Sequence, residues 1–475
     1  MSINKTARLG TIFLAFLAVS ACTTVGPDYH VPSAAAINNP AALGNFKGSS
    51  EVPFAQAPLP AHWWHLYQDP ILDGLIAKAF DANTDLRIAS ANLARARSVQ
   101  REFEDASRPE VGVNAAPAYG KPSAVAMGLG ERIPNSWLYD TGVKVSYQVD
   151  LFGKIARSIE ASRADTQATE AALDMTRVTI AAETANAYAD ICGVGQQLVI
   201  AQKSVDIQKK FVQLTEDRVR TGRGTAFDIS RVKSQLAQLK AALPTLQAQQ
   251  KLGQYRLEAL LGGLPGSLPD AVAHCGKPLK MDSPIPTGDG AALLKRRPDI
   301  RQAERRLAVA TARIGVATAD LYPSISLGMT AGSTGELAQF GAENAGRWSI
   351  GPLISWTLPS TGTARSRIAQ AEASTDAELA RFDGIVLNAL RETESSLTVY
   401  ARELDRNAAL RAARDQSEIA AEQARTLYRY GRTDFLTTLD ADRTLASQES
   451  VLAASNTKLV SDQVTLFLSL GGGWE

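Results

Sequence analysis

The sequence contains one pattern twice, and this duplication limits the folds that the chain can adopt. Matching positions follow in the same order in both halves: Asp85–Arg87 with Asp299–Arg301, Pro109 with Pro323, Arg220–Arg223 with Arg429–Arg432, and Leu261–Gly262 with Leu470–Gly471. Chance can supply one such match but hardly the whole ordered set. The set therefore predicts two repeats, at about 66–275 and 280–473.

Each repeat is expected to contain a helix, two strands, a long helix, a tip turn and a return helix. Alternating apolar and polar residues predict the strands, and a helical period after Gly153 and Gly362 predicts the long helices. The first-repeat ranges are strands at about 111–119 and 138–151, a long helix at 153–221, a tip turn at 221–225 and a return helix at 226–261. The second-repeat ranges are strands at about 324–332 and 347–358, a long helix at 362–430, a tip turn at 430–434 and a return helix at 435–470. Pro244 is expected to kink or break the first return helix.

The stretch 143–151 alternates between apolar and polar residues without a break. Its apolar members are Val143, Val145, Tyr147, Val149 and Leu151. A strand of about ten residues is long enough to cross a bilayer at a tilt. We therefore expect these five side chains to face outer-membrane lipid and the polar residues between them to face a lumen.

Four such strands cannot close a barrel within one chain. An open sheet in lipid would leave the backbone groups of its edge strands without hydrogen-bond partners, which costs several kcal/mol for each group. Strands from several chains must then share one barrel, and only a wide barrel leaves a water-filled lumen. The alternative is a soluble pair of hairpins that caps a helical bundle. The fold expected from the first interpretation is mainly α with a membrane β-barrel portion.

The N-terminus has the pattern of a secretory signal. Lys5 and Arg8 precede an apolar run from Leu9 to Val19 that is too short to span a bilayer. We interpret 1–21 as a signal peptide and 22–65 as an extended segment. The sequence before Cys22 resembles the bacterial lipobox, in which the cysteine becomes the lipidated first residue, and Thr23 after it resembles the outer-membrane sorting pattern. An ordinary signal peptide that happens to contain a cysteine is the alternative.

Composition argues against several functions. The formal net charge is +1, which disfavours nucleic acid as a partner. No apolar run after Cys22 is long enough for a transmembrane helix. His62 and His65 have a metal-like spacing but no carboxylate or thiol nearby in sequence, and no Gly-rich phosphate loop occurs. We expect no enzyme activity, no metal and no cofactor.

Two cysteines remain beyond the N-terminal segment. Cys192 lies about thirty residues before the first tip turn, level with the region near 255–260 on the antiparallel return helix. Cys275 follows a dozen or so residues later, so it can reach the height of Cys192. A disulfide is possible in the oxidising periplasm, and two isolated thiols are the alternative.

Several motifs resemble one known family. They are Cys22–Tyr29, Trp64 with Asp69–Ile76, Val149–Gly153, Arg296–Arg301 with Ala303–Arg305, and Leu321–Ser326. In order and spacing they resemble the outer-membrane factor family, the TolC/OprM-type exit ducts of tripartite efflux pumps, and within it the NodT-like lipoprotein branch. The resemblance implies a homotrimer with a shared twelve-stranded β-barrel in the outer membrane and a twelve-helix α-barrel that extends into the periplasm.

The resemblance also implies roles for residues at the helical tips. Leu436 and Asp440 match the apolar and acidic rings of the periplasmic gate, and their alternative role is packing and a solvated charge. The residues that would line the tips and contact a periplasmic adaptor (membrane fusion) protein are Gly222, Arg223, Tyr428, Gly431, Arg432 and Asp434. Arg223, Arg432 and Asp434 are candidates for salt bridges between helices that hold the duct shut, or else are solvated charges.

The implied function is a passive conduit for small toxic compounds. An inner-membrane pump, proton-driven (RND-type) or other, would supply the energy through the adaptor. Two other functions remain compatible with the sequence. One is the outer-membrane duct of a type I protein secretion system, and the other is a non-conducting coiled-coil lipoprotein tether.

Overall fold

The structure is a computed structural model that describes residues 24–50, 54–55, 57–121, 123, 125, 128, 130, 133–281, 283–356 and 361–472. The expected signal peptide and Cys22 lie outside the described residues. The chain forms two compact units. The first unit contains the described residues up to Pro32 with Asn92–Thr169 and Gln302–Phe382, and the second contains Ser33–Ala91, Glu170–Arg301 and the chain from Asp383 onward.

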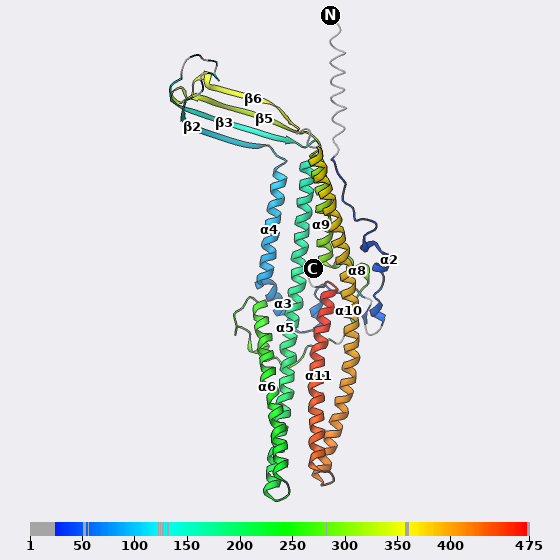
Figure 1. The fold of residues 1–475 in the computed structure, drawn as a ribbon. Helices are drawn as coiled ribbons and strands as arrows, with labels where there is room; N and C mark the ends of the chain where they lie inside the picture. Colours follow the sequence, from blue (N-terminus) through cyan, green and yellow to red (C-terminus); the bar gives the residue numbers. More distant parts are fainter. Residues whose placement is uncertain are drawn as a thin grey trace. The chain divides into compact units, whose positions relative to one another are not determined.

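The duplication is visible in the order of the elements (Figure 1). The first repeat contains α3 (Pro70–Ala82), α4 (Thr84–Asp105), β2 (Glu110–Gly120), β3 (Ser136–Val149), α5 (Lys154–Arg220) and α6 (Ala226–Leu260). The second repeat contains α8 (Gly290–Arg296), α9 (Pro298–Ala319), β5 (Ser324–Glu336), β6 (Gly346–Ser355), α10 (Thr361–Arg429) and α11 (Phe435–Ser469). A mainly helical, internally duplicated fold with four long strands is therefore confirmed.

Short elements connect the repeats and form the N-terminal segment. They are the helices α2 (Pro40–Leu43) and α7 (Asp270–Ala273), the strands β1 (Phe54–Ala55) and β4 (Ile285–Pro286), and the 3-10 helices at Ala36–Asn38, Lys47–Ser50, Trp63–Tyr67, Leu337–Gln339 and Glu343–Ala345. The strands β1 and β4 pair in parallel. No helix in the described ranges has both the length and the apolar character needed to cross a membrane.

Two sequence expectations differ from the structure. Strand β3 ends at Val149, so Leu151 is not part of it. The reason lies in Asp150, whose carboxylate accepts the Ala156 amide hydrogen at 2.7 Å and caps the start of α5. Helix α6 is not broken at Pro244 and continues to Leu260. Because Pro244 is exposed, water can satisfy the backbone carbonyl that the proline leaves without a donor.

The long helices of the second unit pair as two antiparallel hairpins (Figure 1). In the α10–α11 pair, Asn407 donates to the side chains of Ser455 (3.0 Å) and Asn456 (2.8 Å). The N-terminal segment contributes to the same core, because the Trp63 ring stacks on Phe467 with 4.6 Å between ring centroids. The packing surface is thus distributed along the hairpins and is not one globular core.

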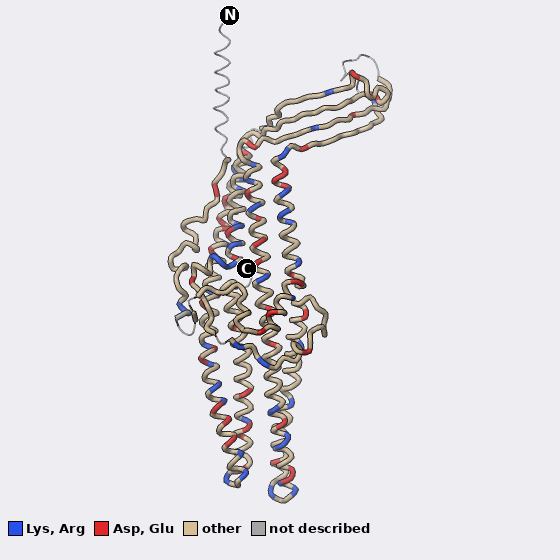
Figure 2. Tube along the Cα trace, turned by 180° about the vertical axis from the view of Figure 1, so that it is seen from behind, with Lys and Arg blue, Asp and Glu red and all other residues tan. Residues whose placement is uncertain are grey.

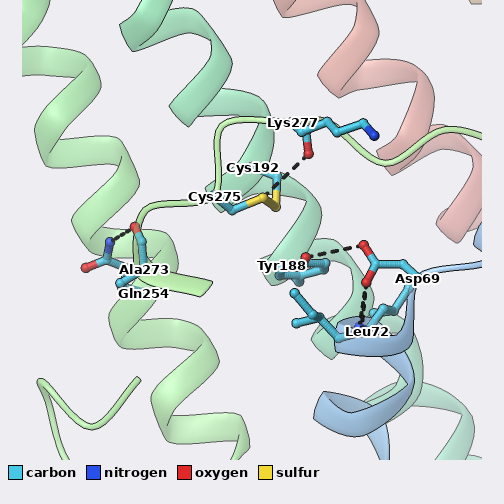
Figure 3. The surroundings of a disulfide bond; sticks show 9 residues. Asp69, Leu72, Tyr188, Cys192, Gln254, Ala273, Cys275 and Lys277 are labelled. Atoms are coloured by element: carbon cyan, nitrogen blue, oxygen red, sulfur yellow. Dashed lines mark hydrogen bonds between the residues drawn. A yellow bond between two sulfur atoms is a disulfide. The ribbon is translucent and has the colours of Figure 1, made fainter. Parts of the chain in front are cut away.

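A disulfide joins Cys192 of α5 to Cys275, just after α7 (Figure 3). The backbone approaches closely here, since a Cβ on Gly195 would lie 1.9 Å from the Cys275 carbonyl oxygen. Gln254 of α6 donates to the Ala273 carbonyl at 2.7 Å. The segment after α6 is therefore held against both helices of the first hairpin.

Replacing both cysteines (Cys192→Ser with Cys275→Ser) is expected to lower the thermal midpoint by several degrees. The bond links residues 83 apart in sequence, and losing it frees the unfolded chain at a cost of about 2–4 kcal/mol in the free energy of unfolding. Far-ultraviolet circular dichroism in detergent measures the midpoint. Reduced wild type should have the same thermal midpoint as the variant. Equal thermal midpoints for oxidised wild type and the variant would contradict the expectation.

Candidate functional site: the two-faced sheet and the helical tips

The four long strands form one antiparallel sheet in the order β2-β3-β5-β6. Its register aligns apolar residues of all four strands on one face. The aligned rows are Val113–Val143–Ala331–Trp348, Val111–Val145–Met329–Ile350, Tyr147–Leu327–Pro352 and Val149–Ile325–Ile354. Alternation along one strand therefore becomes a continuous apolar surface across the sheet.

The opposite face is mostly polar. Three of its rows are Gly112–Lys144–Thr330–Ser349, Glu110–Ser146–Gly328–Gly351 and Gln148–Ser326–Leu353, in which Leu353 is the one large apolar residue. Arg347 of β6 reaches across the small residues of β5 and donates to both Asp140 carboxylate oxygens, at 2.6 and 2.7 Å. Asn114 of β2 donates to the same carboxylate at 2.8 Å. This face is held together by hydrogen bonds between side chains.

The apolar face is exposed in the single chain. Val113 is 80% exposed, Trp348 78% and Ile350 71%. Figure 2 shows that charged residues are dense along the helices and sparse on the strands. A monomeric soluble protein rarely exposes a contiguous apolar surface of this kind. The edge strands β2 and β6 also have only one strand neighbour each among the described residues.

The two helical tips share one backbone geometry. Gly222 and Gly431 adopt positive φ angles of 73° and 69°, which favour glycine. Each tip closes with a Schellman motif: the Arg223 amide donates to the Arg218 carbonyl at 2.8 Å, and the Arg432 amide donates to the Leu427 carbonyl at 2.9 Å. Both turns thus reverse the chain in the same way.

A contact between the two hairpins lies just above these turns. The Arg218 guanidinium of α5 donates to the Tyr428 hydroxyl of α10, and its carbon lies 5.5 Å from the centroid of that ring. Next to this contact and farther from the turns, Val212 and Val232 of the first hairpin pack with Phe435 and Leu439 of α11. The tips of the two hairpins are therefore joined by an apolar cluster capped with one charged hydrogen bond.

An ion pair lies within the second hairpin. Arg425 of α10 contacts Asp442 of α11 at 2.6 Å. Burial raises the pKa of the Asp442 carboxyl, and the hydrogen bond and charge of Arg425 oppose this rise. Arg425 lies six residues before Gly431 and Asp442 eleven residues after it, so the pair is not evident from their spacing around the turn.

Both repeats of the chain match the model of one protein family. Residues 75–263 and 291–472 match the model of the family described as outer membrane efflux protein. The protein belongs to the outer membrane efflux protein family. The two matched ranges correspond to the two repeats, in agreement with the internal duplication of the sequence.

Relatives and a solved structure agree with this assignment. The toluene efflux pump outer membrane protein TtgF of Pseudomonas putida is 29% identical over 97% of this chain and 95% of its own. The probable outer membrane lipoprotein SilC of Salmonella typhimurium is 26% identical over 99% of both chains. The structure of the outer-membrane channel OprN is 36% identical, with a TM-score of 0.87 over 95% of this chain and 100% of that chain. The protein is the outer-membrane channel component of an efflux pump.

The structure brings Leu436 and Asp440 together on one exposed face of α11, one turn apart. The opposite face of this helix contributes Phe435 and Leu439 to the buried cluster. In the described part of the chain, no residue hydrogen-bonds or pairs with the Asp440 carboxylate. Both gate candidates are thus exposed to solvent in the single chain.

The predicted salt-bridge lock has no support within one chain. Among the described residues, Arg223, Arg432 and Asp434 form no ion pair with one another or with another helix. Asp434 instead caps α11 by accepting the Thr437 amide hydrogen at 2.7 Å, and hydrogen bonds with Thr437 lower the pKa of its carboxyl. Sequence reasoning missed the contact that does join the hairpins, Arg218 with Tyr428, because its partners lie in different repeats.

A further cleft of about 450 Å³ lies at the base of the sheet. It contains the aromatic residues Phe152, Tyr322 and Trp356, and Asp320 pairs there with Lys154 (2.6 Å) and Arg367 (3.1 Å). Charges in the cleft balance, so it presents no evident anion or cation site. In the described ranges no cluster of three His, Cys, Asp or Glu residues suits a metal ion.

Tyr428→Phe is expected to loosen the contact between the hairpins while it preserves the ring that packs on Phe435. Losing the charged hydrogen bond with Arg218 costs about 1.5–3 kcal/mol, which corresponds to at least about tenfold faster hydrogen exchange at the tips where exchange follows local opening. Tyr430→Phe is the matched control, since Tyr430 is exposed at the same tip. Equal exchange in both variants would contradict a role for the Tyr428 hydroxyl.

Proposed function

We propose that the protein is one subunit of a trimeric, passive exit duct that spans the outer membrane and extends into the periplasm. The continuous apolar face of an open four-stranded sheet carries this proposal. In hydrocarbon, such a face is favourable only if the edge strands find partners, because unpaired backbone groups cost several kcal/mol each. Copies of the same chain can supply these partners, because β2 of one subunit can then pair with β6 of the next.

The strand count supports three subunits. Two chains would contribute eight strands and three would contribute twelve. A barrel of about eight strands has its interior filled by side chains or one small ligand, whereas wider barrels leave an aqueous channel. A conduit therefore requires the larger assembly, with Lys144, Ser146 and Gln148 facing its lumen.

The helices would continue the lumen towards the inner membrane. Helix α5 has 67 residues, which corresponds to a length of about 100 Å. The proposed contact surface for a periplasmic adaptor is formed by the two tip turns, which follow α5 and α10. It contains Gly222, Arg223, Tyr428, Gly431, Arg432 and Asp434. The adaptor would couple the duct to an inner-membrane pump, which supplies the energy.

Leu436 and Asp440 are the proposed gate. Their exposure on one face of α11 supports this role, since in a symmetric trimer each would form a ring of three around the lumen. A ring of leucines narrows an opening and resists wetting, and a ring of carboxylates disfavours anions and attracts cations.

Small toxic organic compounds are the proposed cargo. The relative TtgF is described as part of a toluene efflux pump, which is consistent with that class. Lipidation at Cys22 is proposed on the same basis, because the relative SilC is described as an outer membrane lipoprotein.

Val145→Arg and Ser146→Arg form a matched pair that tests the two faces of the sheet. The substitutions are adjacent and introduce the same side chain on opposite faces. Val145→Arg should destabilise the inserted protein by about 2–4 kcal/mol, because it exposes a charge to lipid. Ser146→Arg should have a much smaller effect. Equal losses of folded trimer in lipid vesicles would exclude a lipid-facing role for Val145.

Leu436→Ala with Asp440→Ala should raise the single-channel conductance of the purified duct in planar bilayers, because both rings would widen. Asp440→Asn alone should mainly reduce the preference for cations. Unchanged conductance in a correctly assembled trimer would remove these residues from the gate. Absence of any conductance steps in wild type would instead favour a non-conducting tether.

A further inference from the structure

The segment Thr24–Tyr29, here called the N-terminal strap, is held by a buried arginine. Arg157 of α5 has a side chain only 5% exposed. Its guanidinium donates to the backbone carbonyls of Val25 (3.1 Å) and Gly26 (3.0 Å) and to the carboxylate of Asp28 (2.8 Å). Its Nη1 group donates to the carboxylate of Glu160 on its own helix at 2.7 Å. Most of the hydrogen-bonding capacity of this side chain is thus used on the strap.

Close backbone contacts hold the start of the strap. The Val25 amide donates to the Phe152 carbonyl at 3.1 Å. A Cβ on Gly153 would lie 2.4 Å from the Thr24 side chain, and a Cβ on Gly26 would lie 2.4 Å from the Gly315 Cα. Since Gly153 and Gly26 also have positive φ angles, both positions require glycine.

The end of the strap is held by Tyr29. Its hydroxyl donates to Glu304 at 3.4 Å, and the Arg305 guanidinium carbon lies 5.5 Å from the centroid of its ring. The ring packs on a cluster of small residues from α5 and α9. Five of the six strap residues are therefore fixed by backbone, charged or apolar contacts.

Such fixation is unusual for a segment next to the N-terminus that the proposed processing would create at Cys22. Terminal residues fray unless they are tied down, and ordering the backbone costs about 1–2 kcal/mol for each residue. Burying a guanidinium is also unfavourable unless its donors are satisfied. The free-energy cost of ordering the strap suggests that its position has a function, and the proposed lipidation two residues before it suggests which one.

We propose that Arg157 is a positioning residue for the lipid anchor: by locking the N-terminal strap, it fixes Thr24, from which the chain leads to the anchor, beside the foot of β3. This inference rests on the proposed lipidation of Cys22. Thr24 lies only two residues after that cysteine in sequence. Thr24 in turn contacts Gly153, four residues after β3 ends.

The consequence is a short, stiff link between the anchor and the sheet. A short link gives a high effective concentration of its second binding element, whereas a long flexible one dilutes it. Once the acyl chains have entered the membrane, the strands are held at its surface. The strap thereby favours insertion of the sheet into the membrane over aggregation of its exposed apolar face in water.

Strap release is the first measurement. Chymotrypsin cleavage after Tyr29, followed by mass spectrometry, should be at least about tenfold faster in Arg157→Gln, because three charged hydrogen bonds to the strap are lost. Asp28→Asn should give a smaller increase and tests the strap should Arg157→Gln fail to fold. Arg163→Gln is the control, since Arg163 lies on the same helix with a side chain 61% exposed. Wild-type cleavage rates in both Arg157→Gln and Asp28→Asn would overturn the proposal.

Dependence on the lipid separates positioning from general stability. Formation of protease-resistant trimer in phosphatidylethanolamine–phosphatidylglycerol vesicles is followed for the lipidated protein and for Cys22→Ala behind an ordinary signal peptide. Arg157→Gln should slow the lipidated protein severalfold and leave the non-lipidated protein unchanged. Equal slowing of both would show a structural role only and overturn the proposal. A wild type that forms no trimer at all would refute the proposed function, whereas the cleavage result would still report on the strap.

Discussion

In the described part of the chain, β2 and β6 each have one edge without a strand partner, and this limits the environments in which the sheet is stable. A sheet with one apolar face can enter hydrocarbon, but its unpaired edge strands cannot remain there alone. The register aligns Val143, Ala331 and Trp348 on one face, so in the proposed duct further copies of the chain supply strands on both sides. In that proposal the oligomer is a consequence of the sheet, and the lumen is a consequence of the oligomer.

The helical part meets a different constraint. Long helices without a globular core are stabilised by pairing along their length, so the end of each pair is its weakest point. Three devices reinforce those ends: the Schellman turns at Gly222 and Gly431, the cap formed by Asp434, and the bond between Arg218 and Tyr428. The first two devices act within one turn, whereas the third joins the two hairpins to each other.

Features with a sequence period could be predicted, and features that depend on contacts between distant elements could not. Alternation predicted the strands, and glycine predicted the tip turns. Leu151 was wrongly assigned to β3 because alternation alone cannot show that Asp150 caps a helix. Pro244 does not break α6 because exposure, which sequence does not give, decides whether a lost backbone hydrogen bond can be replaced. The Arg157 contacts join residues about 130 positions apart and leave no local signal.

The two repeats are not mechanically equivalent. The Cys192–Cys275 bond fastens the first hairpin to the segment that follows it, whereas the matched offset places Ala401 at the position of Cys192 in the second hairpin. The second hairpin also carries Leu436 and Asp440. In the proposed duct, opening at the tip requires one set of helices to stay in place while the other moves. Duplication supplied two similar hairpins, and because the covalent bond restrains the first, the second is the one suited to the proposed opening.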